Sequence, residues 1–196
     1  MKRLFTSIIL TLILPFASQA AGIPGMRGAD HVGVTVANLD EAVIFFVDVL
    51  GCEAIFRNPG GKSDDDWMQV NLNVNPRAEI HGFEMVRCGH GTNVEVFEYK
   101  SSDQVKSPPN NSDIGGHHLA FYVDDMEKAV AYLRAEKSVR LLGGPNTTTE
   151  GPAAGQAWIY FIAPWGMQME LVSYPKGRAY EKTSKDKLWD TRDPAK

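Results

Sequence analysis

The chain has 196 residues, a length that fits one domain of ordinary size or two small modules that share a core. Hydrophobic residues make up 43% of it, which is enough to bury a core and excludes a disordered chain. The 20 basic and 24 acidic residues give a net charge of −4, and this acidic balance argues against nucleic acid and anionic membranes as partners.

Residues 1–20 are typical of a secretory signal peptide. Lys2 and Arg3 precede an apolar run that ends at Phe16, and the small residue Ala20 follows where a signal peptidase would cleave. The run is too short to span a bilayer comfortably, which disfavours a membrane anchor. Without these residues, 18 basic and 24 acidic residues remain, a net charge of −6. We therefore expect a periplasmic or secreted protein with no membrane attachment after cleavage.

Two cysteines, Cys52 and Cys88, lie in the part of the chain that would be exported. An oxidising compartment permits disulfides, and neither residue has the spacing of a metal or redox motif. A disulfide between them and two buried thiols are equally compatible with the sequence.

The first half of the chain is predicted to fold as a strand, a helix and three strands. From His31 to Val36, valines alternate with polar or small residues, which predicts a half-buried strand. Asn38 is a helix cap with Glu41 three residues later, and we expect one helix from there until Gly51 ends it. The remaining predictions for this half are strands over 52–57, 78–88 and 92–100, a polar loop over 58–66, and either a strand or an ordered loop over 67–77.

The second half repeats this order after a linker over 101–116 that is rich in Ser, Pro, Asn and Asp. Its first strand, 118–123, again begins with His and ends with Val, and a helix capped by Asp124 or Asp125 follows. The repeat predicts an α+β fold of two tandem βαβββ modules. The predictions for this half are strands over 138–142, 156–162 and 167–174, a turn-rich loop over 143–155, and a tail of no clear period over 175–196.

The repeat also pairs two acidic residues. The tyrosines that end the two halves each lie four residues after a glutamate, so Glu95 corresponds to Glu170. Each half then offers one histidine and one glutamate, His31 with Glu95 and His118 with Glu170. Two imidazoles and two carboxylates suit a divalent ion such as Zn²⁺, Ni²⁺, Co²⁺, Mn²⁺ or Fe²⁺. Four ligands on an octahedral ion leave two positions open for water or substrate, as catalysis requires.

Several motifs of the chain resemble the vicinal oxygen chelate superfamily over roughly residues 28–174. This superfamily includes glyoxalase I, methylmalonyl-CoA epimerase, extradiol dioxygenases and the bleomycin and fosfomycin resistance proteins. The motifs that carry the resemblance are His31-Val-Gly-Val-Thr-Val with Asn38-Leu-Asp-Glu-Ala, Val94-Glu-Val-Phe-Glu-Tyr, Gly116-His-His-Leu-Ala-Phe-Tyr-Val, and Ala163-Pro-Trp-Gly-Met-Gln-Met-Glu-Leu.

The resemblance implies a fold and a set of site residues. It implies one domain over 28–174, with modules at about 28–100 and 117–174 whose mixed sheets curl around a metal-binding cleft, and a homodimer. The metal ligands would come from the first and last strands of each module, with His118 preferred to His117 because it opens its strand. By resemblance to glyoxalase I, Glu170 would be the catalytic base and Glu95 a candidate second base. The implied ligands are His31, Glu95, His118 and Glu170.

The function favoured by this resemblance is an exported, metal-dependent enzyme of the glyoxalase I-like type. Such a lyase or isomerase would act on a small oxygenated substrate by metal-assisted proton transfer. Ala163-Pro-Trp-Gly stands where Asp-Pro-Asp-Gly is more usual, and no basic group that would bind glutathione carboxylates is identifiable, so another isomerase, lyase or epimerase fits as well. The alternatives are an Fe(II) or Mn(II) extradiol-type dioxygenase, and a metal-free binding or resistance protein whose cleft is lined by Trp67, Phe97, Tyr122 and Trp158.

Overall fold

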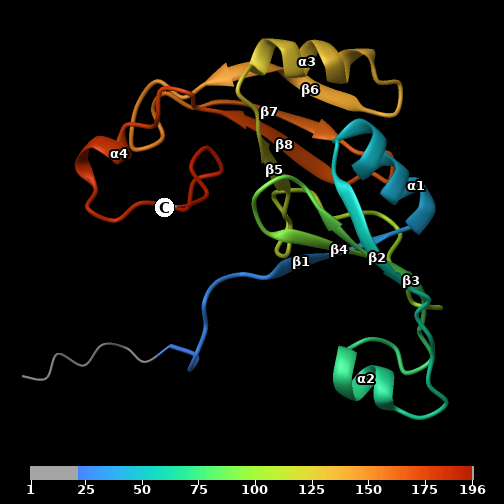
Figure 1. The fold of residues 1–196 in the computed structure, drawn as a ribbon. Coiled ribbons are helices and arrows are strands. Elements are labelled where there is room, and N and C mark those ends of the chain that lie inside the picture. Colours follow the sequence, from blue (N-terminus) through green and yellow to red (C-terminus); the bar gives the residue numbers. More distant parts are fainter. Residues whose placement is uncertain (1–21, 196) are drawn as a thin grey trace, which may run out of the picture.

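The computed structural model describes residues 22–195 and shows two modules in sequence order (Figure 1). The predicted signal peptide over 1–20 lies outside the described residues. No helix in the described part of the chain is long and apolar enough to cross a membrane. The first module consists of β1 (His31–Val36), α1 (Leu39–Ile44), β2 (Glu53–Asn58), β3 (Glu79–Arg87) and β4 (Asn93–Lys100). The second consists of β5 (Leu119–Tyr122), α3 (Met126–Ala135), β6 (Arg140–Thr147), β7 (Ala157–Ile162) and β8 (Gln168–Ser173).

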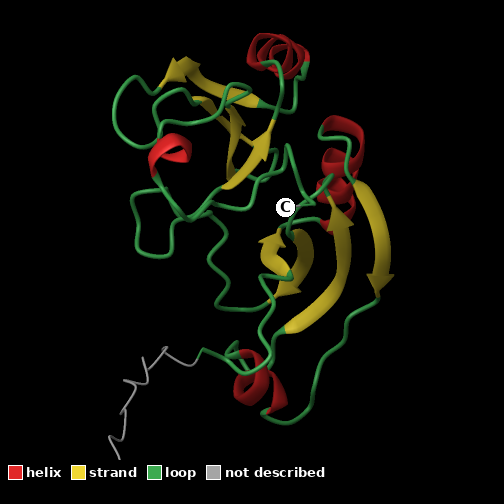
Figure 2. Cartoon of the chain, turned by 60° about the vertical axis from the view of Figure 1, so that its left-hand side comes forward, coloured by secondary structure: helices red, strands yellow, loops and turns green. Residues whose placement is uncertain are grey.

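Each module forms one four-stranded mixed sheet, and the two sheets have the same topology. Their strand orders are β1-β4-β3-β2 and β5-β8-β7-β6. In both, the first strand runs parallel to the last, and the other neighbours are antiparallel. The sheets remain separate and do not close into one barrel (Figure 2). The predicted α+β fold of two βαβββ modules is therefore confirmed.

The helix of the first module is not uniform, although the spacing predicts one helix up to Gly51. Asn38 caps it as expected, since its side chain accepts a hydrogen bond from the Glu41 amide at 3.0 Å. The α-helix ends at Ile44 and continues as the π-helical turn η1 (Phe45–Val49). A π turn widens the helix and shifts the residues it presents to the core. Both consecutive residues Phe45 and Phe46 are buried there.

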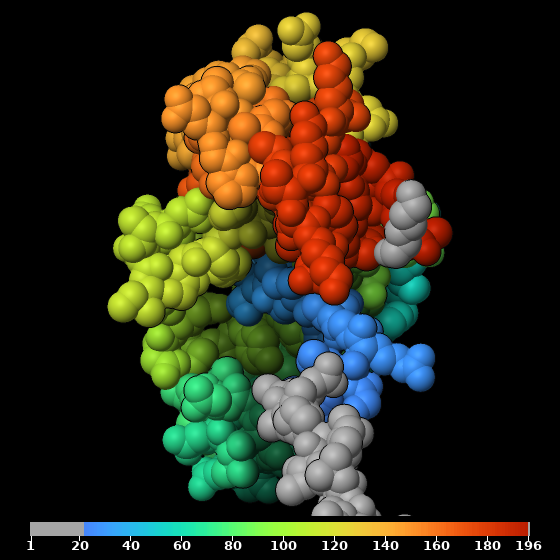
Figure 3. All heavy atoms as spheres, turned by 90° about the vertical axis from the view of Figure 1, so that its left-hand side faces the viewer, coloured from blue at the N-terminus to red at the C-terminus, as the bar shows by residue number. Residues whose placement is uncertain are grey.

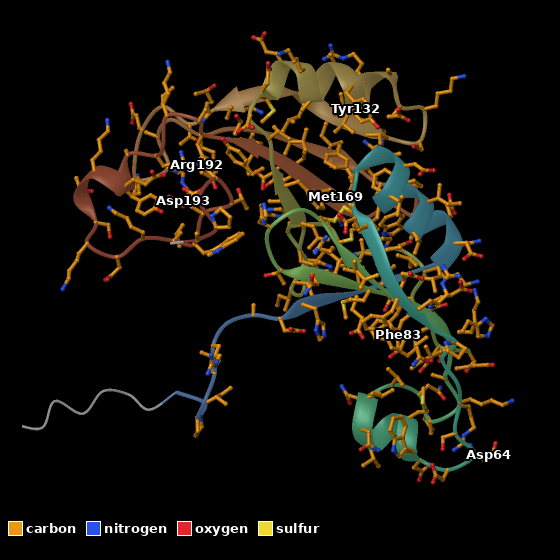
Figure 4. The ribbon with its side chains drawn as sticks, in the orientation of Figure 1. Asp64, Phe83, Tyr132, Met169, Arg192 and Asp193 are labelled. Atoms are coloured by element: carbon orange, nitrogen blue, oxygen red, sulfur yellow. A yellow bond between two sulfur atoms is a disulfide. The ribbon has the colours of Figure 1, made fainter. Side chains whose placement is uncertain are left out.

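One hydrophobic core holds the two modules together. Trp165, in the turn between β7 and β8, has its ring 5.4 Å from that of Phe45 and 5.8 Å from that of Phe46. Met169 on β8 is completely buried in the same cluster, and Figure 4 shows it between the two sheets. Because the first module's helix packs on the second module's last hairpin, the modules form one body.

The two cysteines form a disulfide, which decides between the alternatives that the sequence left open. Cys52 immediately precedes β2 and Cys88 immediately follows β3, so the bond joins the ends of two paired strands. The neighbouring residues Glu53 and Arg87 form an ion pair across the same strands. The open end of this hairpin is thus fixed both covalently and by charge.

The segment between β2 and β3 is an arm that leaves the sheet. The prediction of either a strand or an ordered loop over 67–77 is wrong in part. A short helix, α2 (Trp67–Leu72), forms there instead. The Asp65 carboxylate accepts a hydrogen bond from the Trp67 amide at 2.9 Å, and Asn73 ends the helix in the left-handed conformation. In Figure 1, α1 lies above the first sheet and this arm lies below it.

The base of the arm depends on a glycine. Gly60 has φ +78°, and a Cβ atom there would lie 2.2 Å from the carbonyl oxygen of Ile80. The next residue, Gly61, exchanges two backbone hydrogen bonds with Ile80, at 2.8 and 2.9 Å. The backbones approach too closely here for any larger residue.

Two further differences from prediction lie in the second module. β6 extends to Thr147, into the predicted loop, because a bulge between Leu142 and Asn146 lets the chain pair again with β7. The tail carries a short helix, α4 (Tyr180–Thr183), and packs on the body. Figure 3 shows the tail (red) as a continuous layer between the β6–β7 region (orange) and the segment before β1 (blue).

Candidate active site

The first candidate pair, His31 and Glu95, forms on the first sheet. The parallel register places Glu95 opposite Gly33, two residues along β1 from the histidine and therefore on the same face. His31 Nε2 lies 3.2 Å from Glu95 Oε2. On its other side, His31 Nδ1 lies 2.8 Å from Asp30 Oδ1, and this hydrogen bond raises the pKa of the imidazole. The ring is thus held between two carboxylates.

The second candidate pair, His118 and Glu170, repeats this arrangement on the second sheet. Ala120 lies opposite Glu170 in the register, as Gly33 lies opposite Glu95. His118 Nε2 lies 2.9 Å from Glu170 Oε2, and the Tyr160 ring meets the imidazole edge-on with centroids 5.1 Å apart. Burial raises the pKa of Glu170, while the facing imidazole opposes this shift. In both modules a small residue on the first strand leaves space in front of the carboxylate.

The structure does not bring the two pairs together within one chain. Each pair belongs to its own sheet and starts from an edge strand, β1 or β5. Within residues 22–195, no group of three or more His, Cys, Asp and Glu side chains is arranged to hold a metal ion. The four-ligand site predicted from the sequence therefore stays a prediction, and its two candidate pairs do not form one group in the described part of the chain.

The donor chemistry of each half fits a divalent cation. In each pair an imidazole nitrogen faces a carboxylate oxygen at about 3 Å, so both donor atoms converge on one region. Neutral imidazole and carboxylate are the ligands that Zn²⁺ and related ions accept. The outer nitrogen of His31 already has the carboxylate partner that commonly orients a metal-bound histidine.

His117, the neighbour that the sequence left as a rival to His118, has a different environment. Its Nδ1 lies 3.0 Å from the Gly115 carbonyl oxygen, and the side chain is exposed beside the linker. Only His118 faces a carboxylate on the last strand. The geometry thus favours His118 as the site residue.

A cavity of about 540 Å³ lies beside the first pair, on the same face of the first sheet. Gly33, Thr35, Phe97 and Tyr99 form its sheet side. The arm and the linker contribute its polar rim, and no motif in these segments predicts a part in the site. The only signal was the abundance of Asn, Ser, Asp and Gln in these segments, which is equally typical of loops. The arm and linker residues are Asn73, Val74, Asn75, Ala78, Ser101, Asp103 and Gln104.

The aromatic residues suggested as a common cleft lining do not lie together. Phe97 lines the cavity of the first sheet, whereas Trp67 lies on the arm with half of its surface exposed. Trp158 packs against Tyr160 on the second sheet, with centroids 5.4 Å apart. Tyr122 packs against Tyr174, which the tail covers.

The tail is fastened to the second module through Tyr174. The guanidinium carbons of Arg178 and Arg192 lie 4.1 and 4.6 Å from the centre of its ring. Arg192 also donates a hydrogen bond to the Tyr174 carbonyl oxygen at 2.6 Å and is paired with Asp190 and Glu181. The tail therefore borders the end of β8 that follows Glu170.

Comparison with known proteins shows which family the chain belongs to. The model of the glyoxalase/bleomycin resistance protein/dioxygenase superfamily matches residues 30–160. The chain belongs to this superfamily. The resemblance predicted from the motifs is thereby confirmed, and members of the superfamily commonly use divalent metal ions.

One relative within the superfamily is similar along most of its length. The chain is 45% identical over 168 residues to a 2-epi-5-epi-valiolone epimerase of an Actinomyces species. The aligned residues make up 86% of this chain and 91% of that protein. This similarity supports an enzyme of the superfamily.

Solved structures share the superfamily fold at low sequence identity. A glyoxalase family protein of Bacillus cereus is 16% identical with a TM-score of 0.57, covering 78% of this chain and 98% of that one. A trypanothione-dependent glyoxalase I of Leishmania major is 19% identical with a TM-score of 0.50, covering 80% and 92%. At these identities the likeness concerns the fold alone.

Proposed function

We propose that the chain is an exported epimerase that inverts a carbon beside the carbonyl of a small oxygenated substrate. The observation that carries this proposal is the 45% identity, over most of both chains, to an enzyme whose name states an epimerisation of a ketone. The duplicated His–Glu pairs supply the residues for it. The glyoxalase I-like type expected from the sequence shares the proton transfer, and the relative favours the epimerase among the expected alternatives.

Inversion of a carbon beside a carbonyl needs a base on one side and a proton donor on the other. Glu170, buried and facing His118, is proposed as the base that takes the proton. Glu95, its counterpart in the other module, is proposed to pass a proton taken up from solvent to the opposite face, while Glu170 releases its proton to solvent and both carboxylates are restored. A divalent ion held by His31, Glu95, His118 and Glu170 would polarise the carbonyl and so acidify the neighbouring C–H bond.

We propose further that two copies of the chain complete the site. Because the pairs do not meet within one chain, the first sheet of one copy would supply His31 and Glu95, and the second sheet of its partner would supply His118 and Glu170. A two-fold symmetric dimer would then hold two equal sites. This is the homodimer that the resemblance implies.

Export is supported by the disulfide. The signal peptide itself lies outside the described residues, but Cys52–Cys88 is of a kind that persists in an oxidising compartment. A periplasmic or secreted location is therefore part of the proposal.

Proton exchange tests the reaction directly. Protein supplied with Zn²⁺, Ni²⁺, Co²⁺ or Mn²⁺ would be incubated with 2-epi-5-epi-valiolone in D₂O, and the ¹H NMR signal beside the ketone followed. We expect the wild type to exchange this proton and Glu170→Gln to lose about 10²- to 10⁴-fold in rate. Glu127→Gln, an exposed glutamate on α3, is the matched control and should keep the rate. Equal exchange by Glu170→Gln and the control would remove Glu170 from the mechanism.

Mixing two inactive variants tests the shared site. If Glu95 and Glu170 of one site come from different copies, dimers that combine Glu95→Gln with Glu170→Gln contain one intact site. Half of the dimers are mixed after random exchange, so about a quarter of the wild-type activity should return. Activity that stays at the level of the separate variants, with subunit exchange verified, would show instead that each chain builds its own site.

A further inference from the structure

The cavity beside the first His–Glu pair has a position that suits one part of a substrate. Gly33, opposite Glu95, lines the cavity, and the next residues of the same face are Thr35 and Phe97. Residues that share a face of a strand are about 7 Å apart. Thr35 therefore lies about 7 Å along β1 from Gly33 and about 13 Å from His31, so a ligand the size of one six-membered ring beside Thr35 would reach the level of Glu95.

The floor of this cavity is aromatic. Phe97 and Tyr99 both line the cavity with ring centroids 5.4 Å apart, and Phe97 also packs against Phe83, which is not part of the lining, at 5.1 Å. Such a surface packs well against the C–H face of a saturated ring, because aromatic faces provide flat apolar contact with a partial negative charge.

The rim of the cavity is polar and partly fixed by its own hydrogen bonds. Asp103 of the linker is hydrogen-bonded to Ser101 and to Asn75 of the arm, so the two walls are joined. Gln104 Nε2 donates to the Tyr99 carbonyl oxygen at 2.9 Å. These contacts hold the rim in place without a ligand.

Asn73 and Thr35 are exposed residues that line the cavity. No hydrogen bond to another described residue occupies the side-chain amide of Asn73 or the hydroxyl of Thr35. An amide presents both donors and an acceptor, and a hydroxyl presents one donor and acceptor sites, which together match the hydroxyl groups of a polyol.

The charge of the lining limits the ligand further. Among residues 22–195, no Lys, Arg or His lines the cavity, and Asp103 is the one carboxylic acid in its lining. An anionic substrate, such as a phosphate ester or a glutathione adduct, would meet a carboxylate and no cation there. The lining suits a neutral ligand.

We propose that this cavity is the specificity subsite of the enzyme and binds the hydroxyl groups of a neutral, polyhydroxylated six-membered ring. The ring would pack on Phe97, with hydroxyl groups at Asn73 and Thr35 and its reacting carbon toward His31 and Glu95. This orientation of the carbonyl rests on the proposed function, whereas binding of the polyol does not.

Direct binding of unreactive probes tests the subsite. The whole protein, without added metal, would be titrated with myo-inositol, cyclohexanol and myo-inositol 1-phosphate while amide NMR shifts are recorded. We expect myo-inositol to shift the resonances around Asn73 and Thr35, and to bind more tightly than the other two. Stronger binding of the phosphate ester, or myo-inositol shifts confined to other regions, would overturn the proposal.

Two substitutions refine the test. Asn73→Gly removes the amide yet keeps the left-handed backbone, and Thr35→Val removes the hydroxyl at nearly constant shape. Each should weaken myo-inositol binding about 3- to 10-fold. Asn71→Ala is the matched control, because Asn71 lies on the same helix and bonds to the Trp67 carbonyl outside the cavity. Thermal unfolding confirms that each variant folds, and unchanged binding by both folded variants would contradict the assignment.

Kinetics separate this proposal from the proposed reaction. With 2-epi-5-epi-valiolone, Asn73→Gly should raise KM about 3- to 10-fold with little change in kcat, whereas Glu170→Gln should lower kcat. Polyol binding without any epimerisation would support the subsite and refute the reaction. Epimerisation with neither polyol binding nor a change of KM in Asn73→Gly would support the reaction and refute the subsite.

Discussion

Reduction of the Cys52–Cys88 disulfide is expected to lower the free energy of unfolding by about 4 kcal/mol. The two cysteines are 36 residues apart. A cross-link over this length removes about 13 cal/mol/K of entropy from the unfolded chain, which at 25 °C corresponds to about 4 kcal/mol. For a chain of this size, that difference lowers the unfolding temperature by about 8–16 °C.

The assay is urea denaturation of the wild type with and without a thiol reductant, followed by tryptophan fluorescence, with free thiols counted to prove complete reduction. The Cys52→Ala/Cys88→Ala double variant is the control and should be insensitive to reductant. If the fully reduced wild type unfolds within about 1 kcal/mol of the oxidised protein, the loop-closure reasoning would be refuted.

Three further predictions concern the fold around the site. Glu98 accepts a hydrogen bond from the first amide of α1, which lowers its pKa, so its contribution to stability is present at neutral pH and lost as the pH falls below its ordinary pKa of 4.5. Glu98→Gln should therefore cost about 1 kcal/mol at pH 7 and nothing in strong acid, as measured by urea denaturation across pH. Phe46→Ala empties a completely buried position and should cost about 3–5 kcal/mol in the same assay; a loss below about 1 kcal/mol would show that the site collapses. Gly60→Ala places a methyl group against the Ile80 carbonyl and should destabilise by more than about 1–2 kcal/mol, with faster hydrogen exchange in the arm, whereas Gly144→Ala has open space and should be nearly neutral.

The repeat made the sheets predictable. The alternating valines in β1 and the matched sequence in β5 identify two strands. Because the apolar residues of a strand share its buried face, the residues between them must share the other face. The pairing of His31 with Glu95 and of His118 with Glu170 followed, because both members of each pair lie on the open face of neighbouring strands.

The arm and the π turn could not be predicted in the same way. The helix α2 has one buried residue, Met68, so it has almost no hydrophobic period to recognise. At its start, the Asp65 carboxylate accepts a hydrogen bond from the Trp67 amide. In the widened turn η1, Phe45 and Phe46 pack against Trp165, which lies over a hundred residues further along the chain. Local patterns do not contain such contacts.

Whether the His31–Glu95 pair meets the His118–Glu170 pair depends on how whole sheets associate. Identical strand patterns are compatible with a site inside one chain and with a site between two chains. No residue type in either half distinguishes these arrangements.

The tail has a practical consequence for working with this protein. The motifs of the superfamily end near Tyr174, so a shortened chain designed from them would stop there. Such a chain would lose Arg178 and Arg192 from the Tyr174 ring, together with the backbone bond from Ala179 to Ala154. An affinity tag is therefore better fused after the last residue than in place of the tail, because the folding unit of this protein is longer than its repeat.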